Sequence, residues 1–206
     1  MYRIVPEKVI TNNLKTFNMK TLVLTLTILF GLGTQVFAED LNVGDKAPNF
    51  TATSVDGSSW SLKNHVGDKN IVVYFYPAAM TGGCTKQACA YRDFGSDLES
   101  EDAMVVGISG DNVGGLKIFK NAYDLDFTLL SDSSGEIAQK FGVPTRDGGT
   151  IEREIDGKNV ELVRGATASR WTFIIDKDGK VVYKNDEVNA QDDPQDVLNF
   201  LKNKTE

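Results

Sequence analysis

Two cysteines five positions apart are the residues of this chain best suited to chemistry. Cys84 and Cys89 are separated by four residues, and the stretch leading to Cys84 begins with Pro77. It follows an apolar run at 71–76 and opens a predicted helix over 85–100. A cysteine in the first helical turn meets free backbone N–H groups and the positive end of the helix dipole, and both favour the thiolate. The predicted chemistry is nucleophilic attack by sulfur, and a peroxide oxygen is a fitting electrophile.

The spacing of the two cysteines constrains any disulfide between them. In an intact helix, residues five apart are separated by about 7.5 Å of rise, so their Cα atoms lie roughly 8–9 Å apart, beyond the limit of about 7 Å for a disulfide. A bond from Cys84 to Cys89 therefore requires part of the helix to melt, and the strained product is easily reduced. Two buried structural cysteines, or a simple clip, are the alternative interpretation, although so short a loop stabilises little.

The residues around Cys84 suit a small substrate. Pro77 ends the preceding strand and stiffens the loop. Gly82 and Gly83 permit close approach of a small molecule to the backbone. Thr81 offers a hydroxyl to whatever binds the thiolate, or it only caps the helix.

The elements that must position this segment alternate between strands and helices. Apolar runs predict strands at 71–76, 104–109, 172–176 and 181–183, the last two joined by an Asp-Gly turn. Helices are predicted at 85–100, 113–123, 135–141 and 194–203. A polar hairpin is predicted at 49–62, and an inserted surface hairpin at 150–163. This order indicates one α/β layered domain.

Composition excludes several classes of protein. The 206 residues are 41% hydrophobic and 25% charged, a balance typical of a folded domain. The formal net charge of −7 argues against a general nucleic-acid binder. Two cysteines and one histidine exclude a four-cysteine zinc site and a disulfide-rich scaffold.

The N-terminus has the pattern of a secretory signal. Lys20 precedes an apolar stretch at 21–33, and Val36 and Ala38 stand at the −3 and −1 positions of a cleavage site after Ala38. We therefore expect a leader and signal peptide at 1–38 and one domain at 39–206. We also expect an exported, periplasmic or secreted location, with no stable membrane association after cleavage. An uncleaved membrane anchor is the alternative, although the apolar stretch is short for a span.

Three segments resemble peroxiredoxins, most closely the Q-type or bacterioferritin-comigratory subfamily. The run YFYPAAMTGGCTKQACAYRDF at 74–94 is similar to the family's active-site segment: Pro77, Thr81 and Cys84 match its signature, and Cys89 stands at the resolving position. The opening at 43–50 resembles the family's GDxAPxF motif. Arg170 precedes Trp-Thr-Phe-Ile-Ile-Asp, as the family's distant arginine does. The chain departs from the subfamily at Gly82, often proline, at Gln87, often glutamate, and in the length of the inserted hairpin.

This resemblance implies a thioredoxin-like fold: a central mixed sheet flanked by helices, with an N-terminal hairpin and one inserted hairpin. It implies a thiol-dependent peroxidase in which Cys84 is peroxidatic and Cys89 resolving. Arg170 would hold the thiolate and the peroxide. Thr81 and the N–H groups of Gly83 and Cys84 would position the peroxide, while Pro77 would shield the site from water.

The resemblance also implies the partners. An intramolecular disulfide between Cys84 and Cys89 would be reduced by a thioredoxin-like dithiol, with no metal or organic cofactor. The implied assembly is a monomer or weak dimer, because both cysteines come from one chain.

Each supporting residue has a plainer interpretation. The plainer interpretation of Arg170 is a surface salt-bridge partner, with Arg92 as the reserve arginine for Cys84. His65 is expected to be solvated and without a role. Trp60 and Trp171 are expected to pack, and the acidic cluster at 186–196 to form a solvated face and a helix N-terminus.

Three other functions stay open from the residues alone. An envelope thiol–disulfide oxidoreductase shares the fold but favours the spacing Cys-x-x-Cys. A copper(I)-binding module would use the two cysteines and His65. A non-enzymatic interaction protein would leave peroxide decay unchanged when Cys84 is replaced.

Overall fold

A computed structural model of the chain describes residues 41–155 and 157–205. The predicted signal peptide and its cleavage point lie outside the described residues. Over the described part, no helix combines the length and apolar character needed to cross a membrane.

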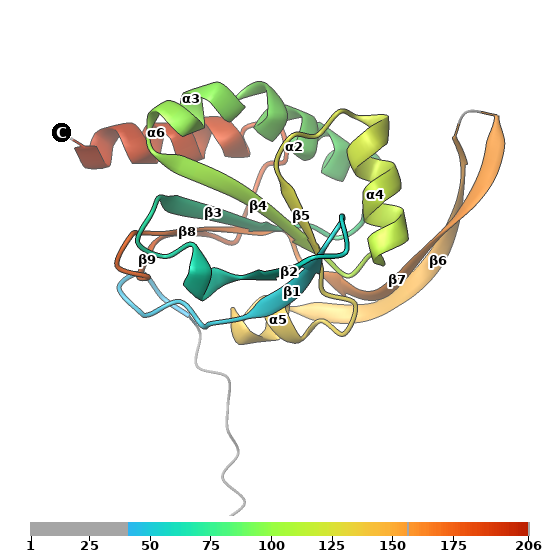
Figure 1. Cartoon of the computed structure of the whole chain (residues 1–206), viewed down its shortest axis with the longest axis horizontal. Helices are drawn as coiled ribbons and strands as arrows, with labels where there is room; N and C mark the ends of the chain where they lie inside the picture. Colours follow the sequence, from blue (N-terminus) through green and yellow to red (C-terminus); the bar gives the residue numbers. More distant parts are fainter. Residues whose placement is uncertain (1–40, 156, 206) are drawn as a thin grey trace, which may run out of the picture. The chain divides into compact units, whose positions relative to one another are not determined.

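A mixed sheet forms the centre of the described domain (Figure 1). Its strand order is β2-β1-β5-β4-β3-β8-β9. Strands β3 and β4 pair in parallel, as do β4 and β5, whereas the other neighbours are antiparallel. The strands are β1 Thr51–Ser54, β2 Ser59–Ser61, β3 Asn70–Phe75, β4 Ala103–Ser109, β5 Thr128–Ser131, β8 Trp171–Ile175 and β9 Val181–Asn185.

Helices cover both faces of this sheet. Helices α2, α3 and α6 lie on one face, and α5 lies on the other (Figure 1). The helices are η1 Leu62–Asn64, α2 Gly82–Asp93, α3 Gly95–Ser100, α4 Val113–Ala122, α5 Glu136–Lys140 and α6 Asp193–Thr205. The single helix predicted at 85–100 is therefore two helices, with Phe94 at the junction in a conformation between helix and extended chain.

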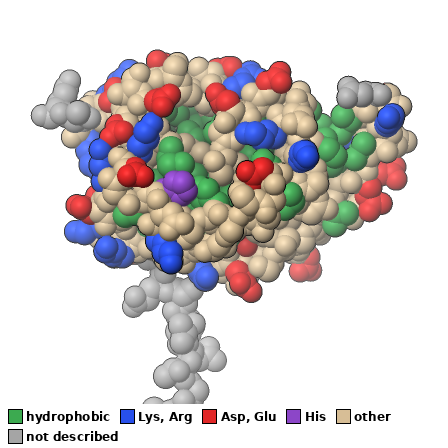
Figure 2. Space-filling model, in the orientation of Figure 1, with side chains coloured by type: hydrophobic (Ala, Val, Ile, Leu, Met, Phe, Trp, Pro, Cys, Tyr) green, Lys and Arg blue, Asp and Glu red, His purple; other side chains and the backbone are tan. Residues whose placement is uncertain are grey.

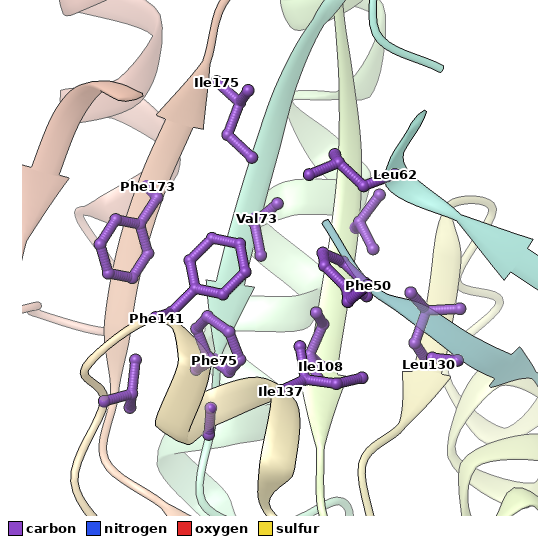
Figure 3. Close-up of a cluster of buried hydrophobic side chains, with 14 of the residues drawn as sticks. Phe50, Leu62, Val73, Phe75, Ile108, Leu130, Ile137, Phe141, Phe173 and Ile175 are labelled. Atoms are coloured by element: carbon purple, nitrogen blue, oxygen red, sulfur yellow. The ribbon is translucent and has the colours of Figure 1, made fainter. Parts of the chain in front are cut away.

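The alternation of side chains along β3 produces two cores. Ile71, Val73 and Phe75 belong to one buried cluster, in which Phe75 packs against Phe141 of the segment following α5 (Figure 3). Val72 and Tyr74 point to the opposite face and pack beneath the helices. Burial on both faces explains why this strand is continuously apolar.

The inserted hairpin is longer than predicted. It consists of β6 Thr145–Ile155 and β7 Lys158–Ala168, which pair along their whole length and project as an arm from the domain (Figure 1). Only the outer part of the arm was predicted, because its base alternates weakly in polarity. Strand β5 was also missed, since it has four residues and only two of them are buried.

The architecture confirms the predicted α/β class. The central mixed sheet, the flanking helices, the N-terminal hairpin β1–β2 and the inserted hairpin are all present in the described residues. Figure 2 shows acidic and basic side chains interspersed on the visible face.

Candidate active site

The sheet register carries a distant arginine to the cysteine segment. Strands β3 and β8 pair with Phe75 opposite Trp171. The chain leaving β3 leads to Cys84, and Arg170 immediately precedes Trp171. Cys84 and Arg170, 86 positions apart, therefore meet near the point where β3 ends and β8 begins.

Cys84 is the third residue of α2, and its side chain is buried, with 2% of the residue exposed. Arg170 donates a hydrogen bond from Nη2 to the Cys84 sulfur at 3.3 Å. The N–H groups of Gly82, Gly83 and Cys84 have no acceptor four residues earlier in α2, whose first backbone bond runs from the Thr85 N–H to the Thr81 carbonyl. A guanidinium and a helix N-terminus thus act on the same sulfur, and both favour a negative charge there.

The two arginines considered as partners of Cys84 make different contacts. Arg170 contacts Cys84 and Gln87 rather than a surface acid. Arg92 instead bonds the Asp93 carboxylate and the Tyr123 carbonyl. The reserve role of Arg92 at Cys84 therefore has no support in the geometry.

Thr81 is the N-cap residue of α2, but its side chain does not cap the helix. Its hydroxyl donates to the Ala78 carbonyl at 2.8 Å. This bond leaves the oxygen's lone pairs available, and it holds the side chain within the loop that starts at the half-buried Pro77. The interpretation of Thr81 as a simple side-chain cap was wrong.

The two predicted glycine positions differ in their surroundings. A Cβ atom on Gly83 would lie 3.4 Å from Nη2 of Arg170, whereas one on Gly82 would meet open space. A side chain at position 83 would therefore touch the guanidinium that contacts the sulfur. Gly82 has no comparable neighbour.

Cys89 lies in the same unbroken helix as Cys84. Both thiols are free, Cys84 buried and Cys89 half-buried. Because α2 runs without interruption from Gly82 to Asp93, the two cysteines are held at helical spacing, too far apart for a disulfide.

A buried acid, Asp111, holds the loop before Cys84. Asp111 accepts hydrogen bonds from the Ala79 N–H and the Ser109 hydroxyl, both at 2.8 Å. Burial raises the pKa of Asp111, against the lowering effect of these bonds. Met80, which follows Ala79, has a φ of 60°, a conformation that non-glycine residues rarely adopt. The loop is thus held in a strained shape by a buried carboxylate.

A polar chain extends from Arg170 away from the sulfur. Arg170 Nη1 donates to the Gln87 Oε1, and Gln87 Nε2 donates to Asp193 Oδ2 at 2.7 Å. Tyr91 and Thr172 donate to the same Asp193 oxygen, at 2.6 and 2.9 Å. Asp193 is fully buried at the start of α6.

This burial corrects the interpretation of the acidic cluster at 186–196. The helix N-terminus was predicted correctly, but Asp193 is not solvated. An aspartate before a proline resembles an ordinary helix start, so the sequence held no signal for its role. Gln87 could have been found, because it lies one helical turn after Cys84 on the same face.

The remaining candidates are structural. Trp60 is buried and packs on Phe50, and Trp171 packs against the same core, as predicted. His65 is not merely solvated, because its ring stacks on Trp60 with centroids 4.6 Å apart. Within the described residues, no group of three histidine, cysteine or acidic side chains is arranged to hold a metal.

Fold and site together define a domain built around a buried, arginine-bonded thiol at a helix N-terminus. The AhpC/TSA family model matches residues 43–184, and the chain belongs to this family. Its fold is that of the thioredoxin-like peroxiredoxins, which confirms the predicted fold and resemblance.

Relatives of known name support the same assignment. The chloroplastic peroxiredoxin Q of Oryza sativa subsp. japonica is 42% identical over 140 residues, covering 68% of this chain and 57% of the rice protein. A putative peroxiredoxin of Mycobacterium tuberculosis is 42% identical over 150 residues, or 73% of this chain and 88% of that protein. The crystal structure of peroxidoxin BcpB from M. tuberculosis superposes with a TM-score of 0.66 at 33% identity, covering 79% of this chain and 97% of that one.

The relatives contradict the location predicted from the N-terminus. Peroxiredoxin Q proteins of rice, Populus jackii and Triticum aestivum, all related to this chain, are named as chloroplastic. The prediction of an exported, periplasmic or secreted protein was therefore wrong. It was based on a local pattern of one lysine, an apolar stretch and a cleavage site, and such a pattern does not identify the compartment that a targeting segment addresses.

Proposed function

We propose that this chain is a thiol-dependent peroxidase that reduces hydrogen peroxide and alkyl hydroperoxides. The observation that carries the proposal is the hydrogen bond of 3.3 Å from Arg170 to the sulfur of Cys84 at the N-terminus of α2. Few other arrangements stabilise a thiolate and present a cation to a small oxygen electrophile at the same point.

In the first step, the Cys84 thiolate attacks the terminal oxygen of the peroxide. The S–O bond forms as the O–O bond breaks, and the leaving oxygen takes a proton and departs as water or an alcohol. The sulfur is oxidised to sulfenic acid and the peroxide is reduced. Arg170 stabilises the charge on the reacting oxygens, while Thr81 and the N–H groups of Gly83 and Cys84 position them. Pro77 shields the site from water.

In the second step, the Cys89 thiolate attacks the Cys84 sulfenic acid. A disulfide forms, and the hydroxyl leaves as water. Because α2 holds the cysteines at helical spacing, the first turn of this helix unwinds for the bond to form. A thioredoxin-like dithiol then reduces the disulfide by exchange and is itself oxidised.

The proposed cycle is complete within one chain. We therefore propose that the protein acts as a monomer or weak dimer, and that it needs no metal or organic cofactor. The absence of stable membrane association and the division at residue 38 stay predictions.

Peroxide consumption by the reduced protein, measured without any added reductant, tests the proposal. We expect the wild-type chain to consume about one equivalent of hydrogen peroxide rapidly, and Cys84→Ser to consume none. Cys89→Ser is the matched control, because it removes the other thiol but leaves the attacking one. Consumption that persists in Cys84→Ser, or fails in the wild type, contradicts the proposal. Reduction of insulin without peroxide consumption would instead indicate a thiol–disulfide oxidoreductase.

A further inference from the structure

Three hydrogen bonds link Asp193, the first residue of α6, to the sulfur of Cys84. Asp193 Oδ2 accepts from Gln87 Nε2 at 2.7 Å, Gln87 Oε1 accepts from Arg170 Nη1, and Arg170 Nη2 donates to the sulfur at 3.3 Å. These hydrogen bonds join three places that are far apart in the sequence: α2, the residue preceding β8, and α6.

The orientation of the Gln87 amide decides what this chain does. A guanidinium has only donors, so Arg170 requires the amide oxygen. The amide nitrogen must then face an acceptor, and Asp193 provides one that has no competing donor function when ionised. Were the amide reversed, two donors would face each other at Arg170. Asp193 therefore selects the orientation in which Gln87 holds one arm of the guanidinium.

Asp193 is a buried acid that accepts several hydrogen bonds. It is fully buried, and three donors converge on one of its oxygens: Gln87, Tyr91 at 2.6 Å and Thr172 at 2.9 Å. Burial raises the pKa of Asp193, whereas these hydrogen bonds oppose the rise and favour the carboxylate. Burial also raises the pKa of Tyr91 well above its ordinary value, so this phenol keeps its proton and donates.

We propose that Asp193 is a positioning residue for the peroxidase reaction, acting on Cys84 through Gln87 and Arg170. The inference rests on the proposed function and adds a residue to it. Asp193 touches neither the sulfur nor the guanidinium. It keeps Arg170 aimed at the sulfur by one Nη group while its charge stays separated from the guanidinium by an uncharged amide. Coulomb attraction weakens with distance, so Asp193 offsets less of the guanidinium's positive charge than a carboxylate in direct contact with Arg170 would. More of that charge therefore acts on the thiolate and the peroxide.

The pair formed by Gln87 and Asp193 has a reciprocal alternative that makes the inference testable. Gln87→Glu alone would bring two buried carboxylates within hydrogen-bonding distance, and their repulsion would displace Arg170 or force one to bind a proton. Combining Gln87→Glu with Asp193→Asn restores one acid and one amide in the opposite order. The new amide can donate to the carboxylate at position 87, which can again accept from Arg170.

The experiment measures the rate constant with which the reduced protein reacts with hydrogen peroxide, without a reductant, in four variants. We expect Asp193→Asn to lower it about tenfold and Gln87→Glu about 10- to 100-fold, as for loss of a buried charge-assisted bond. The double variant is expected to recover to within about threefold of the wild type. Asp196→Asn is the matched control: it removes an exposed charge from the same turn of α6 and should change the rate less than about twofold.

Recovery in the double variant distinguishes positioning from a merely structural role, because a destabilising pair of substitutions would add rather than cancel. Rates within about twofold of the wild type for Asp193→Asn and Gln87→Glu overturn the inference. So does a double variant that is unfolded by circular dichroism, or no faster than the slower single variant. A wild-type chain that consumes no peroxide overturns the proposed function instead, so the two failures are distinguishable.

Discussion

Two buried carboxylates serve the active-site sulfur, and they differ in what they hold. Asp111, two residues after β4, bonds the backbone N–H of Ala79 and so fixes the loop before Cys84. The carboxylate of Asp193, at the start of α6, accepts from the side chains of Gln87, Tyr91 and Thr172, and through Gln87 it reaches Arg170. One acid shapes the backbone and the other aims a charge. The difference teaches that loop shape and electrostatics are set by separate elements, so each can be disturbed alone.

Among substitutions that disturb the electrostatics of the site, we expect those of Arg170 to have the largest effect on the peroxide rate. We expect Arg170→Met to lower the rate constant with hydrogen peroxide by about 100- to 1000-fold, because the developing charge loses its cation. Arg170→Lys should retain part of the rate, since a point charge replaces the two-armed donor. Stopped-flow measurement of single-turnover oxidation gives both values. A loss below about threefold for Arg170→Met would show that the guanidinium is only a neighbour of the sulfur.

Asp111 is the corresponding point on the loop side. Asp111→Ala leaves the buried Ala79 N–H and Ser109 hydroxyl without their acceptor, which should lower the free energy of unfolding by about 1–3 kcal/mol. We expect the peroxide rate to fall about tenfold, as the loop relaxes. Asp111→Asn keeps an acceptor oxygen and should retain most of both quantities. Urea denaturation and single-turnover kinetics test this, and equal behaviour of the two variants would refute the anchoring role.

Both acids should also reveal themselves in the pH dependence of stability. Burial raises the pKa of Asp193 and of Asp111 above the ordinary value of 3.8. Protonation of such a group favours the folded state. Its contribution is complete below the pKa of the unfolded chain and is lost as the pH rises through the folded value.

The free energy of unfolding of the wild type relative to Asp193→Asn should therefore fall as the pH rises from about 3 to about 7. The same comparison with Asp111→Asn should have the same sign. The phenols facing Asp193 do not titrate in this range, because burial raises the pKa values of Tyr74 and Tyr91 well above their ordinary value. Guanidinium denaturation at a series of pH values measures the slope. A difference that grows with pH would mean that the carboxylates gain more from their bonds than they lose by burial.

Thr81 should give the smallest effect. Its hydroxyl bonds the Ala78 carbonyl at 2.8 Å, within the loop that Asp111 already holds. We expect Thr81→Val to lower the peroxide rate about threefold to tenfold through loss of one hydroxyl, and Thr81→Ser to keep it. Equal rates for the two variants would remove the hydroxyl from the proposed mechanism.

Features of the fold and site that depend on neighbouring residues could be predicted from the sequence, whereas contacts between residues far apart in the chain could not. The buried strand at 71–76 and the helix after it have local patterns, so the placement of Cys84 at a helix N-terminus was available from the sequence. Arg170 was found only through resemblance, because its approach to Cys84 depends on the pairing of β3 with β8.

Asp193 and Asp111 were beyond reach of the sequence. The sequence does not distinguish a buried aspartate from an exposed one. Burial of these two acids results from how α6 and β4 pack rather than from a local sequence pattern. The compartment was mispredicted for a related reason: an apolar N-terminal stretch is a local pattern, whereas the receptor that reads it is not part of the chain.

The central claim is that one sulfur attacks peroxide and a second sulfur resolves the product. Mass spectrometry of the reduced protein after one equivalent of hydrogen peroxide tests it most directly. We predict that the wild type loses two hydrogens, with the disulfide mapped to Cys84 and Cys89, and that Cys89→Ser instead gains one oxygen on Cys84. An unchanged mass, or an oxygen carried by Cys89 in place of Cys84, would contradict the account.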